Sequence, residues 1–227
     1  MIQVSEMERQ LGQTATIHMT KKGLETRQKL LTAAEQVFGA SGYYEASIVM
    51  ITQEAQVAQG TFYNYFPSKK AIYEELIRQL SRDLRSKIKI EVTTAHSHEE
   101  ALSLGFQAFF RWVKEHRNLY GIVQQAVLVD EELYRWYYDK LASGFIKSLT
   151  AAMEEKAFRS LDKETLAYCL MSIGQFLGMR WVYWENQEVP VEVFETAMSF
   201  ILQGMGKKDE NTQIVKEDVY AWDCLLD

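Results

Sequence analysis

A run of eleven residues from Gln59 to Lys69, QGTFYNYFPSK, constrains the fold of this chain more than any other segment. Four aromatic side chains occur within five positions, and small polar residues and lysines surround them. The run is too polar to be buried entirely and too aromatic for an ordinary solvated loop. On a short helix, Phe62 and Phe66 fall on one face at i, i+4 spacing, which leaves the polar side chains on other faces. An apolar anchor behind hydrogen-bonding side chains, with cations beside them, is what a DNA recognition helix requires.

The segment before this run predicts the rest of a helix-turn-helix. Apolar residues recur at helical spacing over residues 30–38, which predicts a first helix, and Gly42 follows as a stop signal. Ser47 precedes an apolar stretch and predicts the N-cap of a second, short helix. Pro67 disfavours the helical conformation in the residue before it and so ends the third helix. Ser68 then predicts the cap of a fourth helix that runs toward residue 89.

Residues from about 24 to 70 resemble the DNA-binding domain of the tetracycline-repressor (TetR) family of bacterial transcription regulators. The resemblance covers about a fifth of the chain and implies a homodimeric, all-helical repressor with a second, ligand-binding domain downstream. The family leaves the ligand open, because that domain varies widely. The matching residues are Ala33, Ala34, Phe38, Gly42, Tyr43, Ser47, Ile51, Ala55, Val57, Gly60, Thr61, Tyr63, Tyr65, Phe66 and Lys69.

Two residues in the turn depart from the family pattern. Gln56 stands where the family usually has glycine, and a left-handed conformation there costs a residue with a Cβ about 1 kcal/mol. Ala58 stands where serine or threonine is usual, and the lost N-cap costs a similar amount, about 1 kcal/mol. Neither change is large enough to undo the fold, but a serine phosphate contact at position 58 is absent.

The expected partner is double-stranded operator DNA, with the third helix of each subunit in the major groove of a palindrome. Gln59 and Tyr63 are the candidates for base contacts, because glutamine can pair with adenine edges. Gly60 lacks a Cβ and allows close approach of its backbone. The candidates for phosphate contacts are Ser47, at the start of the second helix, and Thr61, Asn64, Tyr65 and Lys69.

The distribution of charge agrees with a DNA-binding end. The chain has 227 residues and a formal net charge of −6, which alone argues against a nucleic-acid partner. Residues 20–90, however, carry 11 Lys and Arg against 7 Asp and Glu, whereas the remainder carries 14 against 24. The cations therefore lie with the proposed DNA-binding domain, where phosphate attraction needs them.

From residue 99 onward the periodicity predicts successive helices, near 99–115, 118–129, 131–158, 162–185 and from Pro190 to about Gly204. Ser97 and Glu100 have capping-box spacing. The predicted fold class is all-α. Its parts are a flexible arm over 1–20, a helix-turn-helix domain over 21–68, an effector-binding and dimerisation domain over 69–206 with a connecting helix over 69–90, and a tail over 207–227. The apolar end of that tail is expected to dock on the body.

The last two helices are the candidates for a homodimer interface, as the resemblance also implies. Apolar residues and two glycines at i, i+4 spacing line one face, and small residues there allow a second helix to approach closely. The alternative is an ordinary core within one chain. The predicted interface residues are Leu170, Gly174, Gly178, Trp181, Phe194, Met198 and Ile201.

A pocket for a small-molecule effector is expected among the middle helices, which are rich in aromatic residues and methionine. Polar residues within apolar helices need partners when buried, and a ligand can supply one. Such a pocket suits a largely apolar or aromatic molecule. Its predicted lining is Phe106, Phe110, Tyr120, Gln124, Trp136, Tyr137, Met171, Gln175 and Met179, with Gln175 the first choice among the polar residues.

Other functional classes receive little support from the sequence. There is no glycine-rich phosphate loop and no GxSxG motif, so an all-helical enzyme is a weaker alternative. A DNA-binding dimer without an effector is a second alternative. His96 and His98 precede two glutamates, but no second ligand cluster suggests a metal site, and no cofactor is predicted. With no signal peptide, no membrane-spanning stretch and two distant cysteines, a cytoplasmic protein with free thiols is expected.

Overall fold

The computed structural model describes residues 20–206, so the predicted arm and the docking of the tail lie outside the described part. Within it, all regular structure is helical, which confirms the all-α prediction. The elements are α2 (Lys21–Glu45), α3 (Ile48–Glu54), α4 (Gln59–Tyr63), α5 (Lys69–Val92), α6 (His98–Glu115), α7 (Arg117–Val129), α8 (Glu131–Glu154), α9 (Lys163–Leu177), the π-helix η1 (Gly178–Trp184) and α10 (Val191–Met205).

Side-chain caps set many of the helix starts. At Ser47, Ser68 and Ser97 the hydroxyl accepts a hydrogen bond from the backbone N–H three residues later, as predicted. Glu100 differs from the usual capping box, because its carboxylate accepts from the N–H of His96. Thr20, Asp130 and Asp162 cap three further helices in the same way.

One predicted helix end is confirmed and another is corrected. Gly42, with φ 74° and ψ 168°, has a non-helical conformation that interrupts the helix, as predicted, and a second helical stretch continues to Glu45. These angles favour glycine strongly, because they lie outside the regions open to other residues. Helix α8 ends at Glu154, four residues before the predicted end, and Lys156 just beyond it has a φ of 58°.

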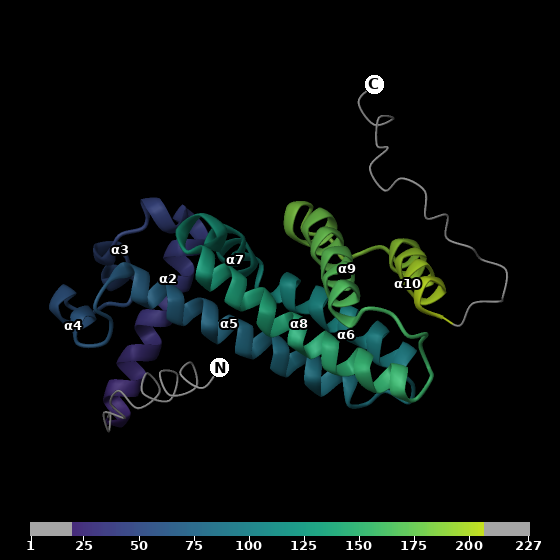
Figure 1. The fold of residues 1–227 in the computed structure, drawn as a ribbon. Coiled ribbons are helices and arrows are strands. Elements are labelled where there is room, and N and C mark those ends of the chain that lie inside the picture. Colours follow the sequence, from purple (N-terminus) through teal and green to yellow (C-terminus); the bar gives the residue numbers. More distant parts are fainter. Residues whose placement is uncertain (1–19, 207–227) are drawn as a thin grey trace.

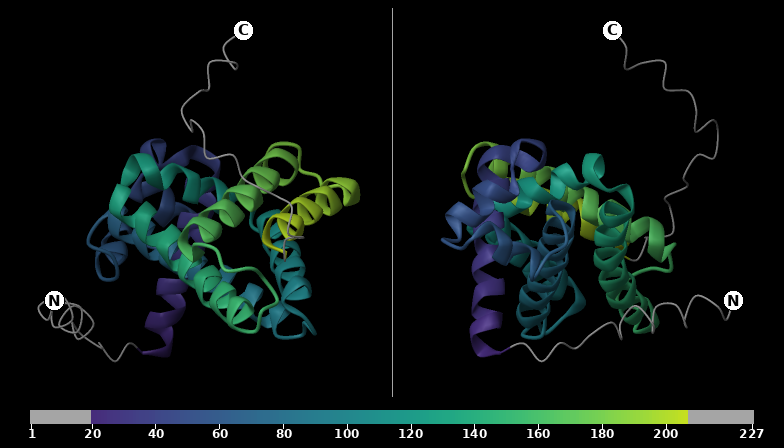
Figure 2. Two further views of the ribbon diagram at one scale, coloured as in Figure 1. Left: turned by 45° about the vertical axis from the view of Figure 1, so that its right-hand side comes forward. Right: turned by 90° about the vertical axis from the view of Figure 1, so that its left-hand side faces the viewer.

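The helices form an elongated bundle with the two ends of functional interest far apart. Helices α3 and α4 lie at one end, and α9 and α10 lie at the other (Figures 1 and 2). The long α5 leads from the first end along α6 and α8, and α2 packs against α7 and α5. A single hydrophobic core runs through both parts of the chain, from Leu30 to Met205. The end that contains α3 and α4, which we call the recognition end, is therefore joined to the remaining helices by side-chain packing as well as by the backbone.

The helix predicted over 162–185 is regular only to Leu177. It continues as the π-helix η1, in which Gly178 and Val182 are buried. A π-helix has wider turns than an α-helix, so the faces of the segment before and after η1 are out of register.

Candidate DNA-binding surface and effector core

Helix α4 presents a polar face on a buried anchor. The Phe62 side chain is fully buried, whereas Tyr63 is 54% exposed. Gln59, Gly60 and Asn64 are exposed beside Tyr63, and a Cβ placed at Gly60 would have no atom within 4 Å. Glycine at this position is thus not required by packing within the chain, and the bare backbone faces solvent. The arrangement can hold several hydrogen-bonding side chains against a major groove.

The remaining predicted phosphate contacts border this face. Thr61 and Tyr65 are partly buried, and Tyr65 packs against the core. The Ser47 hydroxyl accepts from the N–H of Met50 at 3.2 Å, so it is already used as a cap. Its own O–H remains a possible donor to a phosphate oxygen.

The turn between α3 and α4 has both of the unfavourable features expected from the sequence, a left-handed residue and an uncapped helix start. Gln56 has a φ of 54°, in the left-handed region. Ala58 provides no side-chain hydrogen bond at the start of α4. The start of α4 is held instead by a backbone bond of 2.8 Å from the N–H of Thr61 to the carbonyl oxygen of Ala58, and by the burial of Phe62.

Lys69 has a different role from the one predicted. Its ammonium donates to the carbonyl oxygens of Tyr43 at 2.8 Å, Ala46 at 2.7 Å and Tyr44 at 3.3 Å. It also lies 4.6 Å from the centre of the Tyr43 ring. Three carbonyls use the three N–H donors of the ammonium, so none is left for a phosphate in this arrangement. The prediction of a phosphate contact for Lys69 is corrected to a brace that ties the start of α5 to the end of α2.

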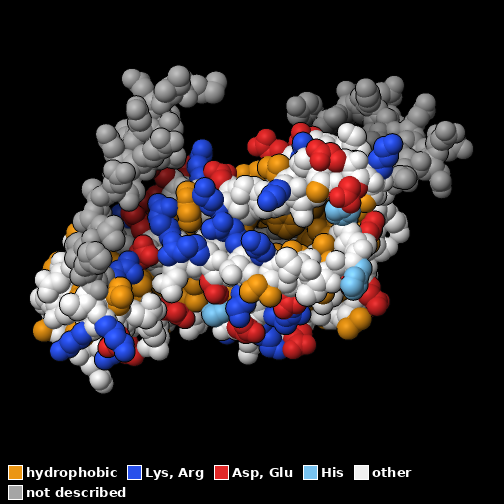
Figure 3. Space-filling model, turned by 90° about the horizontal axis from the view of Figure 1, so that it is seen from below, with side chains coloured by type: hydrophobic (Ala, Val, Ile, Leu, Met, Phe, Trp, Pro, Cys, Tyr) orange, Lys and Arg blue, Asp and Glu red, His pale blue; other side chains and the backbone are white. Residues whose placement is uncertain are grey.

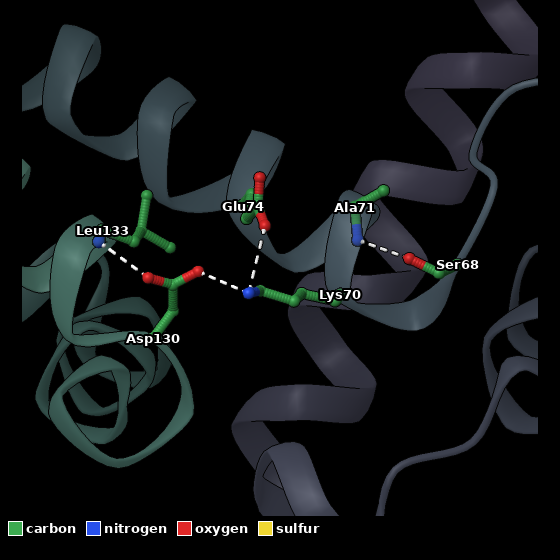
Figure 4. Close-up of polar contacts among 6 residues, drawn as sticks. All are labelled: Ser68, Lys70, Ala71, Glu74, Asp130 and Leu133. Atoms are coloured by element: carbon green, nitrogen blue, oxygen red, sulfur yellow. Dashed lines mark hydrogen bonds and ion pairs between the residues drawn. The ribbon is translucent and has the colours of Figure 1, made fainter.

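The neighbouring Lys70 connects the recognition end to the α7–α8 corner. Its ammonium lies 2.7 Å from the Asp130 carboxylate and 3.8 Å from that of Glu74 (Figure 4). The other oxygen of Asp130 accepts from the N–H of Leu133 and caps α8. The hydrogen bond and charge of Lys70 hold the pKa of Asp130 below its ordinary value of 3.8. A depressed folded-state pKa means that the contact persists above the ordinary value and is lost only as pH falls through the lowered one.

Two more hydrogen bonds join the end of α2 to α7. The backbone N–H of Tyr43 donates to Oε1 of Gln125 at 2.9 Å, and the hydroxyl of Tyr44 donates to the carbonyl of Leu128 at 2.8 Å. Helix α7 is therefore hydrogen-bonded to the end of α2 through the Gln125 side chain and through the Leu128 carbonyl of its last turn. We call these two bonds, together with the Lys70–Asp130 ion pair, the α7 junction.

The predicted effector residues lie mainly in the core formed by the helices that follow α5. Phe106, Phe110, Tyr120, Tyr137 and Met171 are buried, and Gln124, Trp136, Gln175 and Met179 are partly buried. The Tyr120 hydroxyl donates to the carbonyl of Gln175 at 3.1 Å and thereby links α7 to α9. The Gln175 side chain is not needed for that bond. Whether these residues line a ligand site stays a prediction.

Sequence reasoning missed one polar residue in this core. Ser81 is fully buried in α5, and its hydroxyl has no hydrogen-bond partner among residues 20–206. Nε2 of Gln124 is also buried without a partner, although its amide lies beside Tyr138. A buried polar atom without a partner is costly, so each needs an explanation. The signal that the sequence offers for Ser81 is its helical spacing from two apolar residues, Ile77 and Leu84.

Five of the seven predicted dimer residues are buried within the chain, so they are not available on the surface to a second subunit. Leu170, Met198 and Ile201 are buried within the chain. A Cβ at Gly174 or Gly178 would lie 3.1 Å from a ring carbon of Phe106 or Phe109, respectively, so these glycines admit α6 and not a second subunit. Trp181 and Phe194 are partly buried, and the Phe194 ring packs edge-on against Phe110.

The outer face of α9 and α10 carries different apolar side chains. Phe176 is 65% exposed, Phe200 71% and Tyr168 42%. Between the two helices lies an open hollow of about 630 Å³, lined by Glu164, Thr165, Tyr168, Cys169, Ser172, Ile173 and Phe200. We call Tyr168, Phe176, Phe200 and this hollow the outer α9–α10 face.

The comparison with protein families bears on the helix-turn-helix. The model for "Bacterial regulatory proteins, tetR family" matches residues 30–76, which include α3, α4 and the start of α5. Over this segment the chain resembles the tetR family. Over 200 residues it is 27% identical to the uncharacterized HTH-type transcriptional regulator YdgC of Bacillus subtilis, covering 86% of this chain and all of that one.

Solved structures of tetR-like regulators share the fold over most of the chain. The fatty acid degradation regulator FadR of Bacillus halodurans is 21% identical, with a TM-score of 0.70 over 78% of this chain and 94% of that one. FadR of Bacillus subtilis in complex with stearoyl-CoA is 19% identical, with a TM-score of 0.69 over 78% and 98%. At these identities the likeness establishes the fold alone.

With this helix-turn-helix and these relatives, the protein is a DNA-binding transcriptional regulator. The relatives are named as regulators and not as enzymes. None of the helices between residues 20 and 206 has an apolar stretch long enough to cross a membrane. At the start of α6, where no metal site was predicted, Nε2 of His98 lies 2.8 Å from the Glu155 carboxylate.

Proposed function

We propose that this protein is a homodimeric repressor that releases a palindromic operator when a largely apolar effector enters the core between α5 and α9. The observation that carries the effector is a buried hydroxyl without a partner among residues 20–206, Ser81 Oγ, in an aromatic-rich core that also buries Gln124 Nε2 beside Tyr138. A ligand with an apolar body would be buried there, and its polar group would satisfy that hydroxyl. The complex of Bacillus subtilis FadR with stearoyl-CoA makes hydrocarbon chains the first class to test.

The DNA contacts follow from α4. Gln59 and Tyr63 read base edges, Gly60 allows close approach, and Ser47, Thr61, Asn64 and Tyr65 contact the phosphate backbone. Two subunits joined through the outer α9–α10 face would place two α4 helices on successive half-sites. The exposed phenylalanines support that face as the interface, because monomeric proteins seldom expose neighbouring large apolar side chains.

The test is a selection of bound fragments from genomic DNA with the purified protein, repeated at two salt concentrations. An enriched palindrome with half-sites about one helical turn apart is expected. The selected operator is then challenged with a panel of small molecules that have apolar bodies. Release by a compound supports the repressor proposal, whereas an operator complex that no compound changes would favour the effector-independent dimer.

Tyr63→Ala is expected to weaken operator binding by about tenfold to a hundredfold, since one base contact is worth about 1–3 kcal/mol. The exposed ring is not part of the core, so the melting temperature should stay within about 1–2 °C of wild type. Fluorescence anisotropy with the selected operator and thermal unfolding measure the two quantities. Equal affinity for wild type and variant would remove Tyr63 from the contact set.

The α7 junction is the proposed route from effector to DNA. On α7, Gln124 faces the core and Gln125 accepts the hydrogen bond from the Tyr43 backbone N–H. A shift of α7 would therefore change both the effector core and the end of α2. Asp130→Asn removes the charge that Lys70 contacts but keeps a good N-cap for α8. We expect near-normal operator affinity and a coupling between effector and DNA that falls at least about threefold, within the usual range of such energies.

The measurement is effector affinity with and without operator, for wild type and for Asp130→Asn. The ratio of the two affinities is the coupling, and it must be the same when measured from the DNA side. Glu74→Gln is the matched control, because Glu74 lies farther from Lys70 on the same helix. An unchanged ratio in Asp130→Asn would remove the ion pair from the route.

A further inference from the structure

Helix α5 carries arginines with two different environments. Arg82 is exposed and pairs with Glu75 at 3.1 Å. Arg78 and Arg85, seven residues apart, are partly buried, and neither forms an ion pair with any residue between 20 and 206. A partly buried guanidinium without a counter-ion is disfavoured, because the loss of water is not compensated by an opposite charge.

Arg85 is held next to buried polar groups of the core. Its Nε donates to the carbonyl of Ser81 at 3.0 Å, and the Ser81 hydroxyl is the fully buried one without a partner. Burial raises the pKa of the Tyr137 hydroxyl, and the nearby charge of Arg85 opposes that rise. Helix α8, which carries this phenol, packs directly against α5. The Nη groups of Arg85 remain as donors beyond the bond made by Nε.

Arg78 lies two helical turns before Arg85 on the same face of α5. Its guanidinium stacks over the Trp136 ring at 4.4 Å, next to Tyr137 on α8. On the side of the molecule seen from below, Lys and Arg side chains gather beside a hollow whose walls are hydrophobic (Figure 3). Helices α5 and α8 both reach this side in Figure 1. Cations next to an apolar recess suit a molecule with a charged head and an apolar body.

We infer that the effector carries an anionic group, a carboxylate or a phosphate, that binds Arg85 with Tyr137 and Ser81 as further hydrogen-bond partners. The inference rests on the proposed function and specifies the ligand of the same core. A planar guanidinium matches the two oxygens of either anion. The phenol and the hydroxyl each donate one O–H to the same group, and the hydrocarbon body extends into the aromatic core.

The experiment compares ligands that differ only in the head group. Purified full-length protein is titrated with dodecanoate, dodecyl phosphate, dodecanoyl-CoA and the neutral dodecanol, below their micelle concentrations. Thermal unfolding and release of the selected operator are measured for each. At least one anionic ligand is expected to stabilise the protein by mass action and to bind about tenfold or more tightly than dodecanol.

Arg85→Gln should remove that preference and leave the affinity for dodecanol unchanged, whereas the paired and exposed Arg82→Gln should keep it. Equal binding of dodecanol and all three anions by wild type would overturn the anionic group while leaving an apolar effector in place. A preference that persists in Arg85→Gln would overturn the assigned residue. The free acid and the CoA thioester separate a carboxylate from a more distant phosphate as the bound anion.

Failure of the proposed function has a different signature. The panel is extended to chains of 8 to 18 carbons with each head group. If none stabilises the protein or releases DNA, while the operator complex itself forms, the effector proposal is overturned together with this inference. A preference for anions that Arg85→Gln abolishes, without release of DNA, would support the site and contradict repression by release.

Discussion

Replacing Lys69 with methionine is expected to destabilise the whole chain by about 2–4 kcal/mol, even in the absence of DNA. The ammonium donates to three carbonyl oxygens near the end of α2, and methionine has no donor to replace it. Hydrogen bonds from a charged group contribute more than neutral ones, and the carbonyls of Tyr43 and Ala46 are part-buried. Chemical denaturation measures the loss, and operator affinity should fall with it because α2 positions α3.

Lys70→Met is the matched control, since its side chain is next in sequence, half exposed and paired with Asp130. Because the Lys70 ammonium is half exposed and the ion pair is therefore screened by water, removing it costs about 1 kcal/mol. If the two variants were equally stable and only Lys69→Met lost operator affinity, the brace would be wrong and the original phosphate contact correct. The comparison thus separates a structural lysine from a DNA-contacting one.

Phe176→Asp is expected to convert the protein from dimer to monomer and to reduce operator affinity by at least about a hundredfold. The ring is 65% exposed on the outer α9–α10 face, and a carboxylate buried in an interface without a partner costs several kcal/mol. A monomer reads only one half-site, so the second half-site no longer contributes to binding. Sedimentation velocity and operator titration measure the two effects.

Ile90→Asp places the same charge on a side chain that is 62% exposed on α5, away from the proposed interface. That control should remain dimeric and bind the operator normally. A dimeric Phe176→Asp would exclude the outer α9–α10 face as the interface. Gly174→Ala tests the inward packing independently, because its Cβ would press on the Phe106 ring and lower stability without changing the oligomeric state.

Local chemistry made much of the fold predictable. The caps at Ser47, Ser68 and Ser97 depend only on residues within one turn, and Pro67 acts on its neighbour. The buried and exposed faces of α4 follow from Phe62 and from the polar residues around it. These features need no knowledge of distant contacts, and so the all-α class and the recognition surface could be argued from the sequence.

The dimer face and the role of Lys69 depend on contacts between distant segments. Helical spacing groups Leu170, Gly174 and Gly178 on one face correctly, but it cannot tell whether α6 or a second subunit covers that face. Lys69 meets carbonyls that lie more than twenty residues earlier. Arg85 was missed for the same reason, because a single arginine in an amphipathic helix has no sequence feature that distinguishes a core-facing position.

The π-helix between α9 and α10 gives the length of this segment a meaning of its own. Each residue of an α-helix turns the chain by about 100°, so deleting one residue from Gly178–Trp184 would rotate everything that follows relative to α9. A deletion before Val182 would turn its buried side chain away from the core, and the exposed Trp184 would turn toward another side of the bundle. Point substitutions in η1 should therefore be tolerated better than any change in its number of residues. The number of residues in η1 therefore sets the direction in which the chain continues from α9 toward α10.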